Sequence, residues 1–371
     1  MPETTLALEE LAARLRRESP PRARLELGLG PSRFLLESNS APLLRRVRTY
    51  FAPFARDWGR AAASAPATTL TVLDREPPPL PFPFQDWERE PGKALKERCA
   101  DLPGGRIIHK VRTGMHFLIG ETVQMAVGPC LQNSNQVVNF VVTRSTDALL
   151  SAGWLLCHAA GVARRDQGLM LVGFSGRGKS TLALHLLGRG MSYVSNDRIL
   201  LRRLGTRTEM AGVPKLPRVN PGTLLHNPAL GDIIGRERRA QLARLEPGEL
   251  WALEEKYDVD VAASFTGVRL RPRARLHALV FLNWQRDAPS RTTLLPVQLR
   301  ERGDLLEAAM KSPGPFVRRA DGRYPPRFEP PDPRPYLDHL ADVPSFEISG
   351  GVDFERAVAL CLDFFPDPAR A

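Results

Sequence analysis

Apolar positions recur along the chain with two different periods, and each period predicts a different secondary structure. Leucines at helical spacing in residues 4–17 predict an amphipathic helix, with Thr4 or Thr5 as its cap. Two strand-like runs follow at 22–29 and 33–37, and the Gly-Pro-Ser between them predicts a β-hairpin. The chain is therefore expected to begin with a helix and two paired strands.

The same patterns predict the elements that follow. A helix begins after Asn39 or Ser40, has Pro42 in its first turn and ends near Phe51. Apolar runs predict strands at 106–112, 115–119, 122–127, 136–143, 169–172, 191–195, 276–282 and 343–348. Helical patterns predict helices at 147–160, 180–187, 232–245, 305–311 and 354–364. Strands and helices alternate in the second half, which is typical of an α/β fold.

A proline-rich run suggests how the chain is divided. Residues 77–83, Pro-Pro-Pro-Leu-Pro-Phe-Pro, form neither helix nor central strand, because proline fixes φ and lacks an amide hydrogen. We therefore predict an N-terminal helix and α/β segment at 1–76, a proline-rich connector at 77–104, and a core with a C-terminal extension at 105–371. The fold class is α/β, and the β-rich N-terminal region is expected to pack on the sheet of the core.

Length and cysteine usage narrow the class of protein. A chain of 371 residues has enough material for one large α/β domain or two smaller ones. No apolar run reaches the roughly 18 residues of a membrane helix, and the N-terminus lacks the basic start of a signal peptide, so no membrane partner is expected. Cys99, Cys130, Cys157 and Cys361 are far apart and form no C-x-x-C. This predicts neither a zinc site nor a disulfide framework, and favours the cytoplasm.

The positive charge does not by itself indicate a polyanionic partner. The net charge of +11 comes from 52 basic and 41 acidic residues, and only seven of the basic residues are lysine. Nucleic-acid surfaces interleave basic residues with aromatic ones. The two densest basic stretches, 236–239 and 269–275, contain no aromatic residue, so nucleic-acid binding is not expected.

Residues 173–180, Gly-Phe-Ser-Gly-Arg-Gly-Lys-Ser, match the pattern G-x-x-x-x-G-K-[ST] of a phosphate-binding P-loop. An apolar strand precedes the match and a helix follows it, so the helix N-terminus adds its partial positive charge to the amides of the loop. Lys179 is expected near the β- and γ-phosphates of ATP, and Ser180 on Mg²⁺. The predicted nucleotide-binding residues are Gly173, Ser175, Gly176, Arg177, Gly178, Lys179, Ser180 and Thr181.

A second group of polar residues follows the next predicted strand. Asn196 and Asp197 stand at its carboxyl end, where ligands bind in open parallel sheets. Asp197 is thereby placed to face Mg²⁺ or to accept a hydroxyl proton, although a turn aspartate that caps 198–201 fits the same pattern. His158 lies in a predicted apolar helix, where a histidine is more often a core residue.

These pieces together resemble a known family. His158 with Gly161, the P-loop Gly-Phe-Ser-Gly-Arg-Gly-Lys-Ser-Thr, and Tyr-Val-Ser-Asn-Asp at 193–197 are similar to the core of bacterial HPr kinase/phosphorylase, and more closely to HPr kinase-related kinases of the B type. The resemblance is specific over 155–201. It implies a P-loop in a mixed sheet like that of phosphoenolpyruvate carboxykinase, a homo-oligomer, and ATP- and Mg²⁺-dependent phosphorylation of a serine on a small protein. Asp197 would be the base and a magnesium ligand, and His158 a supporting catalytic residue with Lys179.

The sequence departs from the family at two places. The family has two aspartates where this chain has Asn196 and Asp197, and an asparagine can neither take a proton nor bring a full charge to a metal. This argues against the reverse phosphorolysis. The forward kinase reaction is still expected, with Asp197 as its base. The family's arginine-and-glycine signature after the core has no counterpart here, so the resemblance does not extend to HPr as the acceptor.

Three later segments offer further contacts. Lys215, Arg218 and Asn220 stand in a proline-broken loop that is predicted either to contact phosphate or to be a solvated loop. The acidic cluster 254–260 offers carboxylates to Mg²⁺, with a solvated surface as the alternative. Residues 313–335 are rich in proline, and a long loop of this kind is predicted to be a lid or docking arm.

The sequence therefore predicts a P-loop kinase that transfers the γ-phosphate of ATP to a hydroxyl of a small partner protein. Two alternatives remain at this point. One is a nucleotide-binding scaffold that hydrolyses ATP slowly and recruits partners without transferring phosphate. The other is a small-metabolite kinase, for which an enclosed pocket beside Asp197 would be expected in place of an open groove.

Overall fold

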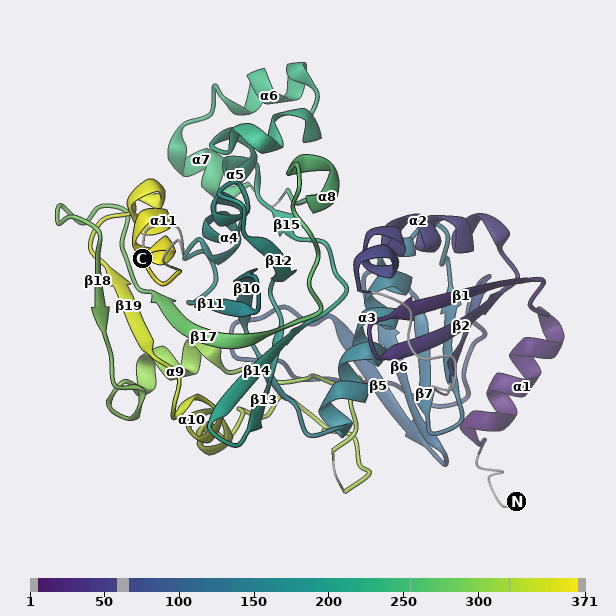
Figure 1. Cartoon of the computed structure of the whole chain (residues 1–371). Coiled ribbons are helices and arrows are strands. Elements are labelled where there is room, and N and C mark those ends of the chain that lie inside the picture. Colours follow the sequence, from purple (N-terminus) through teal and green to yellow (C-terminus); the bar gives the residue numbers. More distant parts are fainter. Residues whose placement is uncertain (1–5, 59–66, 254, 320, 366–371) are drawn as a thin grey trace. The chain divides into compact units, whose positions relative to one another are not determined.

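The computed structural model describes residues 6–58, 67–253, 255–319 and 321–365 (Figure 1). These residues form two compact units, one made of 1–152 with 312–330 and the other of 153–311 with 331–371. The proline-rich run at 77–83 lies inside the first unit, so the division expected at 77–104 does not coincide with this one. Sequence composition marks a stiff segment, but long-range contacts decide the unit to which it belongs.

The first unit is built on one mixed sheet of strands β1–β8. The strands are β1 (Ala23–Leu29), β2 (Ser32–Ser38), β3 (Ala67–Asp74), β4 (Gln85–Asp86), β5 (Glu97–Leu102), β6 (Gly105–Lys110), β7 (His116–Gly120) and β8 (Gln124–Gly128). Their order is β1-β2-β3-β8-β7-β6-β5-β4, in which β3 is parallel to both of its neighbours and the other pairs are antiparallel. The predicted hairpin at 22–37 is confirmed as β1 and β2.

Helices cover both faces of this sheet. They are α1 (Leu8–Glu18), α2 (Ala41–Asp57) and α3 (Ser134–Ser151). Leu118 packs in one apolar cluster with α1, while the neighbouring Phe117 meets Phe140 of α3 with ring centroids 5.0 Å apart. Successive strand residues point to opposite faces, so α1 and α3 lie on opposite sides of the sheet. The predicted first helix is confirmed, and the caps proposed for it at residues 4 and 5 lie outside the described residues.

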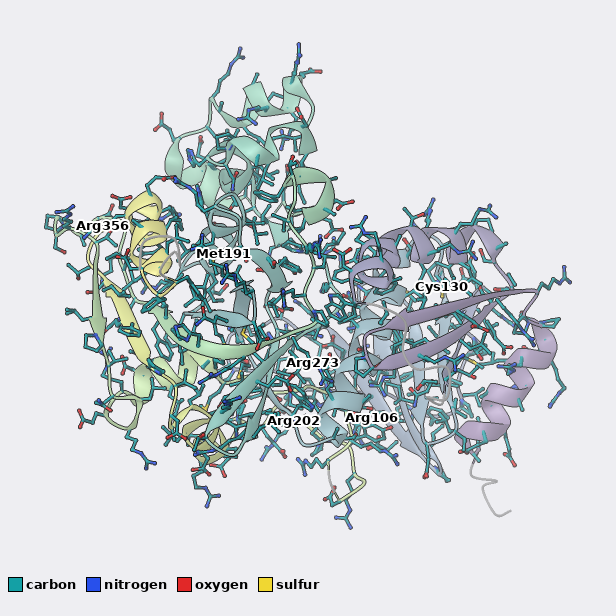
Figure 2. The ribbon with its side chains drawn as sticks, in the orientation of Figure 1. Arg106, Cys130, Met191, Arg202, Arg273 and Arg356 are labelled. Carbon is teal, nitrogen blue, oxygen red and sulfur yellow. The ribbon has the colours of Figure 1, made fainter. Side chains whose placement is uncertain are left out.

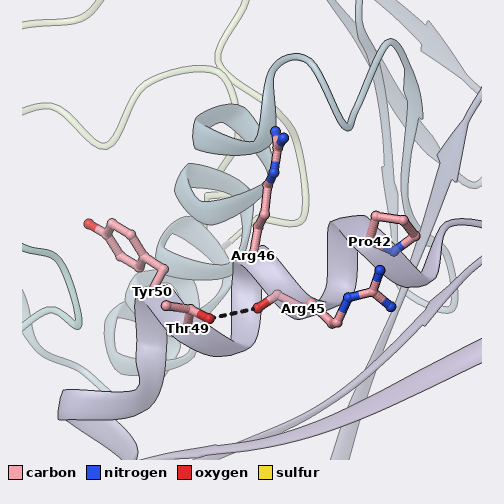
Figure 3. Close-up of a pocket in the computed structure, with 5 residues that line it drawn as sticks. All are labelled: Pro42, Arg45, Arg46, Thr49 and Tyr50. Atoms are coloured by element: carbon pink, nitrogen blue, oxygen red, sulfur yellow. Dashed lines mark hydrogen bonds between the residues drawn. The ribbon is translucent and has the colours of Figure 1, made fainter.

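The outer face of α2 carries a mixture of polar and apolar side chains. Pro42, Arg45, Arg46, Thr49 and Tyr50 line a shallow depression there (Figure 3). The Thr49 hydroxyl donates to the Arg45 carbonyl one helical turn earlier at 3.1 Å. The opposite, apolar stripe of the helix is buried, so α2 is an amphipathic surface helix.

Two secondary-structure predictions around residue 150 are wrong. Residues 136–143 form part of helix α3 and not a strand, because a short run of buried apolar residues fits both structures. The helix predicted for 147–160 ends at Ser151, and the following Gly153 has φ +81°, the left-handed conformation that stops a helix. The expectation that the strands at 106–127 belong to the core with the P-loop is also wrong, since β6, β7 and β8 belong to the first sheet.

The second unit has its own mixed sheet, and the P-loop strand is central in it. The strands are β9 (Leu155–Cys157), β10 (Ala159–Arg164), β11 (Gln167–Val172), β12 (Ser192–Ser195), β13 (Ile199–Leu204), β14 (Arg207–Gly212), β17 (Arg273–Leu282), β18 (Thr293–Pro296) and β19 (Ser345–Ser349). The order β12-β10-β11-β17-β14-β13-β9 is joined by β19, which is parallel to β17. As predicted, 169–172 is a buried strand, and it runs parallel to β17.

Helices again cover both faces of this sheet. Helices α9 (Gly303–Ala309) and α10 (Pro333–Leu340) share a core with one face of β11 and β17. Helix α4 (Lys179–Leu187) packs on β10 and β11, and α11 (Phe354–Leu362) packs beside it. No described helix is both long and apolar enough to span a bilayer.

A helical extension follows β14 on the side of α4 (Figure 1). It contains β15 (Arg218–Val219), α5 (Pro221–Leu225), η1 (Pro228–Ile233), α6 (Arg236–Leu242), α7 (Pro247–Ala252), β16 (Tyr257–Asp258) and α8 (Val261–Ser264). Outside this extension, the short helix η2 (Leu299–Glu301) precedes α9. The single helix predicted for 232–245 is therefore wrong at its start, because Gly235 separates η1 from α6.

An aromatic residue distant in sequence meets one of the basic stretches. Arg202 and Arg273, labelled in Figure 2, stack on the Trp154 ring with guanidinium carbons 4.9 and 5.0 Å from its centroid. Trp154 is only 4% exposed, and Glu209 lies within ion-pair distance of both arginines. The buried ring offers no platform to a nucleic-acid base, so this cluster packs the sheet.

Candidate active site

The P-loop match folds as strand, loop and helix in the predicted order. Strand β11 ends at Val172 and α4 begins at Lys179. Gly176 and Gly178 have φ +84° and +86°, which a residue with a side chain rarely adopts. A Cβ at Gly178 would also lie 2.8 Å from the Phe354 ring. The glycines are therefore required for the backbone path that brings the loop onto the helix N-terminus.

Lys179 lies folded against its own loop. Its side chain is buried, and the ammonium donates to the Gly173 carbonyl and, at 3.2 Å, to the Phe174 carbonyl. Burial lowers the pKa of Lys179 to about 8; the charge of Asp197 opposes this shift and that of Lys311 adds to it. The ammonium is thus a desolvated positive charge that an anion in the loop would stabilise.

Of the other predicted loop residues, some form hydrogen bonds to neighbouring elements and others are exposed at the tip of the loop. Arg177 donates to the Trp284 carbonyl at 2.6 Å, and the Trp284 indole donates back to the Arg177 carbonyl at 2.8 Å. Thr181 shares a hydrogen bond of 2.9 Å with Thr223 on α5. These two side chains hold the loop to its neighbours, whereas Ser175 and Gly176 are exposed at its tip and Ser180 is partly buried on α4.

Asp197 follows directly after β12, as predicted. It adopts φ +69°, a left-handed conformation that only a few per cent of non-glycine residues show and that concentrates at functional sites. Its side chain is 48% exposed, and its carboxylate faces a histidine and two cationic side chains. His158 Nε2 lies 3.4 Å from Oδ1, while Lys311 Nζ and Arg198 Nε lie 3.5 and 3.9 Å from Oδ2.

His158 lies next to Asp197, as expected, but it does not lie on a helix. It stands between β9 and β10, and its amide donates to the Ala309 carbonyl at 2.8 Å. The predicted helix at this position is therefore wrong, while the grouping of His158 with Asp197 agrees with the structure. Burial lowers the pKa of His158, the contact with Asp197 raises it, and the charges of Lys311 and Lys179 lower it further.

Positive charge exceeds negative charge around Asp197. Burial opposes ionisation of this carboxyl, but the contacts with His158, Lys311 and Arg198 outweigh it and hold its pKa far below the usual range. Burial also lowers the pKa of Lys215 to about 8, and the charge of Arg198 adds to this. A carboxylate stabilised in this way accepts a proton poorly until some of the cations find another partner.

Lys311 and Arg198 both lie at Asp197, although sequence reasoning assigned neither of them to the site. Lys311 follows α9 by two positions and reaches Asp197 because Met310 bridges antiparallel to Cys157, the residue before His158. The sequence carried one indirect signal, since only seven of the 52 basic residues are lysine. Three of those seven, all of which lie in the described ranges, gather here as Lys179, Lys215 and Lys311.

The other described residues predicted to contact phosphate or metal take part in ion pairs or helix caps. Arg218 pairs with Asp258 at 3.2 Å, and Glu255 pairs with Arg238, so these carboxylates of the acidic cluster serve local ion pairs. Asp260 caps α8, and Glu254 lies outside the described residues. The described carboxylates of this cluster thus form local ion pairs and a helix cap, and their assignment to Mg²⁺ stays a prediction. Asn220 precedes α5 as its N-cap residue.

The donor set near Asp197 fits a hard cation that is shared with phosphate. Within the described residues there is no group of three or more His, Cys, Asp and Glu side chains able to hold a metal. Magnesium, however, is commonly bound by one or two protein oxygens together with substrate phosphates. Asn196 is 9% exposed, and its Oδ1 is a buried oxygen with no hydrogen-bond partner among the described groups. With Asp197 and Ser180 it offers the oxygen ligands that Mg²⁺ prefers.

Comparison with known proteins adds little to this site. No family model and no curated protein matches the chain. Among solved structures, the HPr(Ser) kinase/phosphatase from Coxiella burnetii aligns with 12% identity and a TM-score of 0.27, over 56% of this chain and 86% of that one. The family resemblance therefore rests on the sequence motifs at 155–201.

Proposed function

We propose that this chain is a kinase that transfers the γ-phosphate of ATP to a hydroxyl group, with a serine of a small partner protein as the acceptor. The observation that supports this best is the excess of positive charge at one half-exposed carboxylate. Lys311 and Arg198 lie within 4 Å of Asp197, and the charge of Lys179 interacts with it. A glycine loop, a helix N-terminus and clustered cations match the charge of a triphosphate.

The proposed reaction assigns a role to each group. The acceptor oxygen attacks the γ-phosphorus, the bond from that phosphorus to the β–γ bridging oxygen breaks, and its electron pair leaves with ADP. The hydroxyl proton passes to Asp197 and then to solvent. Lys179 and the loop amides stabilise charge on the phosphates. Ser180, Asp197 and Asn196 would hold Mg²⁺, which when bound neutralises charge on the phosphate oxygens.

The exposure of the site favours a protein acceptor over a small metabolite. The Asp197 side chain is 48% exposed, and Phe174, at the tip of the P-loop, is 48% exposed as well. A metabolite kinase encloses its substrate, because a small molecule needs most of its surface buried to bind. A half-exposed carboxylate and an exposed aromatic residue on the P-loop suit a serine presented on the surface of another protein.

A transfer assay with radiolabelled ATP tests this proposal. Asp197→Asn removes the proton acceptor at nearly constant shape, so we expect transfer to candidate partner proteins to fall by two orders of magnitude or more. Asp342→Asn is the matched control, because Asp342 is also half-exposed and paired to an arginine, Arg203, in the same unit. Full transfer by Asp197→Asn would contradict the assigned base. ATP hydrolysis without transfer to any acceptor would favour the scaffold.

A further inference from the structure

Lys311 reaches Asp197 through a short antiparallel pairing of two distant segments. Cys157 bridges to Met310, and the His158 amide donates to the Ala309 carbonyl at 2.8 Å. In an antiparallel ladder the next rung on the other side of this bridge joins the Lys311 amide to the Leu156 carbonyl. The pairing thus sets His158 and Lys311 beside each other, one facing each oxygen of the Asp197 carboxylate.

A buried tyrosine bonds to both groups of that next rung. The Tyr336 hydroxyl accepts from the Lys311 amide at 3.1 Å and donates to the Leu156 carbonyl at 2.7 Å. Its ring is 2% exposed and packs in the core between α10 and the sheet. A buried hydroxyl needs hydrogen-bond partners to offset the cost of its desolvation, and this hydroxyl has one acceptor and one donor. Tyr336 therefore fixes the backbone from which the Lys311 side chain extends.

The charge around Asp197 gives Lys311 a second possible partner. One carboxylate cannot neutralise Lys311, Arg198 and the nearby Lys179 together, so an arriving phosphate would find cations in excess. Lysine suits such an exchange, because its ammonium is a point charge on a flexible stem and not a planar fork fixed to one carboxylate. The Lys311 side chain is 24% exposed, which leaves it open to a ligand in the site.

We propose that Lys311 is a second phosphate-binding lysine and that Tyr336 is the residue that positions Lys311. When a nucleotide binds, the Lys311 ammonium moves from the Asp197 carboxylate to the terminal phosphate. This inference rests on the proposed function and deepens it. Lys179, at the start of α4, serves the loop, whereas Lys311 recognises the γ-phosphate and frees Asp197 for the acceptor hydroxyl. Triphosphate is thereby distinguished from diphosphate at the side of the site that carries the base.

Titration calorimetry with the full chain tests this without knowledge of the acceptor. The probes are ADP with Mg²⁺ and a non-hydrolysable ATP analogue with Mg²⁺, and the readout is the ratio of their dissociation constants. Lys311→Met is expected to weaken the ATP analogue by about tenfold, the size of one charge-assisted hydrogen bond, and to leave ADP unchanged. Lys256→Met, at an exposed lysine of the same unit, should preserve the ratio. Lys311→Gln, a second substitution that removes the charge, should give the same result as Lys311→Met. Melting temperatures equal to that of the native chain would show that neither variant has a folding defect.

Tyr336 is tested by a double-mutant cycle in the same assay. Tyr336→Phe should weaken the ATP analogue in the native background and have no further effect in Lys311→Met, because the tyrosine acts through the lysine. A purely structural tyrosine would lower the melting temperature and leave the ratio of dissociation constants unchanged in both backgrounds.

The outcomes separate the two proposals. If the native chain binds neither nucleotide, the proposed function and the role of Lys311 both fall. If the native chain prefers the ATP analogue and Lys311→Met keeps that preference, only the inference on Lys311 falls.

Discussion

Two clusters of cations, one in each unit, use positive charge in opposite ways. In the first unit, Arg144 is 5% exposed and donates to the Asp147 carboxylate and to the Phe316 carbonyl. Arg106, labelled in Figure 2, is 2% exposed and donates to both oxygens of Asp101 and to the Pro325 carbonyl. Each arginine has its own carboxylate and also donates to a backbone carbonyl, so each positive charge is matched by one negative charge.

The cluster around Asp197 lacks this balance. A single carboxylate there faces several cations, two of its neighbours are lysines with a pKa lowered to about 8, and the carboxylate itself is half exposed. The planar guanidinium of arginine holds a carboxylate in one geometry, whereas the ammonium of lysine, on a flexible stem, can move from one anion to another. The comparison teaches that the buried arginines are each matched to a carboxylate, whereas the lysines near Asp197 are not, and this imbalance is what supports the proposed nucleotide site there.

The largest change in the free energy of unfolding is expected from a substitution at the buried Arg144. Arg144→Met leaves the Asp147 carboxylate and the Phe316 carbonyl without their buried donor, and should lower the free energy of unfolding by about 3–5 kcal/mol. Urea unfolding measures the loss, and hydrogen exchange should localise it to residues 312–319. Arg45→Met on the exposed face of α2 (Figure 3) is the control and should change little. A loss below about 1 kcal/mol for Arg144→Met would contradict a structural role for this cluster.

A second test uses pH in the first unit. His116 is 8% exposed between Phe84 and His109, and burial, with the charge of His109, lowers its pKa to about 4. The unfolded state takes up the proton below about pH 6.5 and the folded state only below about pH 4, so stability falls between these values. The loss is about 3 kcal/mol by pH 4.

Urea unfolding midpoints at pH 7 and pH 4.5 measure this dependence in the native chain and in His116→Gln. The variant should lose less stability on acidification than the native chain, and His226→Gln, at an exposed histidine, should behave like the native chain. Equal pH dependence in the native chain and His116→Gln would show that His116 is not held neutral.

The unbalanced cluster is tested at Lys179. Lys179→Met removes a buried ammonium whose described hydrogen bonds go only to carbonyls of its own loop. We expect nucleotide affinity to fall by about a hundredfold, while the free energy of unfolding changes by less than about 1 kcal/mol. Calorimetric titration with ATP and Mg²⁺ and a urea unfolding curve make the two measurements. A large loss of stability with unchanged affinity would place Lys179 with the structural cations.

The smallest effect is expected at an exposed pair. Arg203 and Asp342 lie 2.6 Å apart, with 37% and 50% of their side chains exposed. Water screens such a pair, so Asp342→Asn should lower the free energy of unfolding by less than about 1 kcal/mol. Comparison of its unfolding midpoint with that of Arg144→Met shows how strongly burial decides the value of an ion pair. A loss as large as that of Arg144→Met would break this contrast.

Much of the site could be predicted from local sequence. The glycines, Lys179 and Ser180 occupy adjacent positions, and the strand and helix that flank them are short-range features. Asp197 was found because it follows the next strand. His158 was grouped correctly with Asp197 by resemblance, although the helix predicted around it is two strands, since a run of small apolar residues fits both structures.

The sequence by itself determined the strand, glycine loop and helix at 169–187, because its glycines and its lysine occupy adjacent positions in the chain. Only the tertiary structure decided that Lys311 faces Asp197, that Tyr336 fixes the backbone of that lysine, and that the strands of the first unit form a separate sheet. Those outcomes depend on pairings between segments that are distant in the chain, such as Cys157 with Met310 and Thr71 with Met125. Local periodicity carries no information about such pairings, since they are set by which apolar faces find each other when the chain folds.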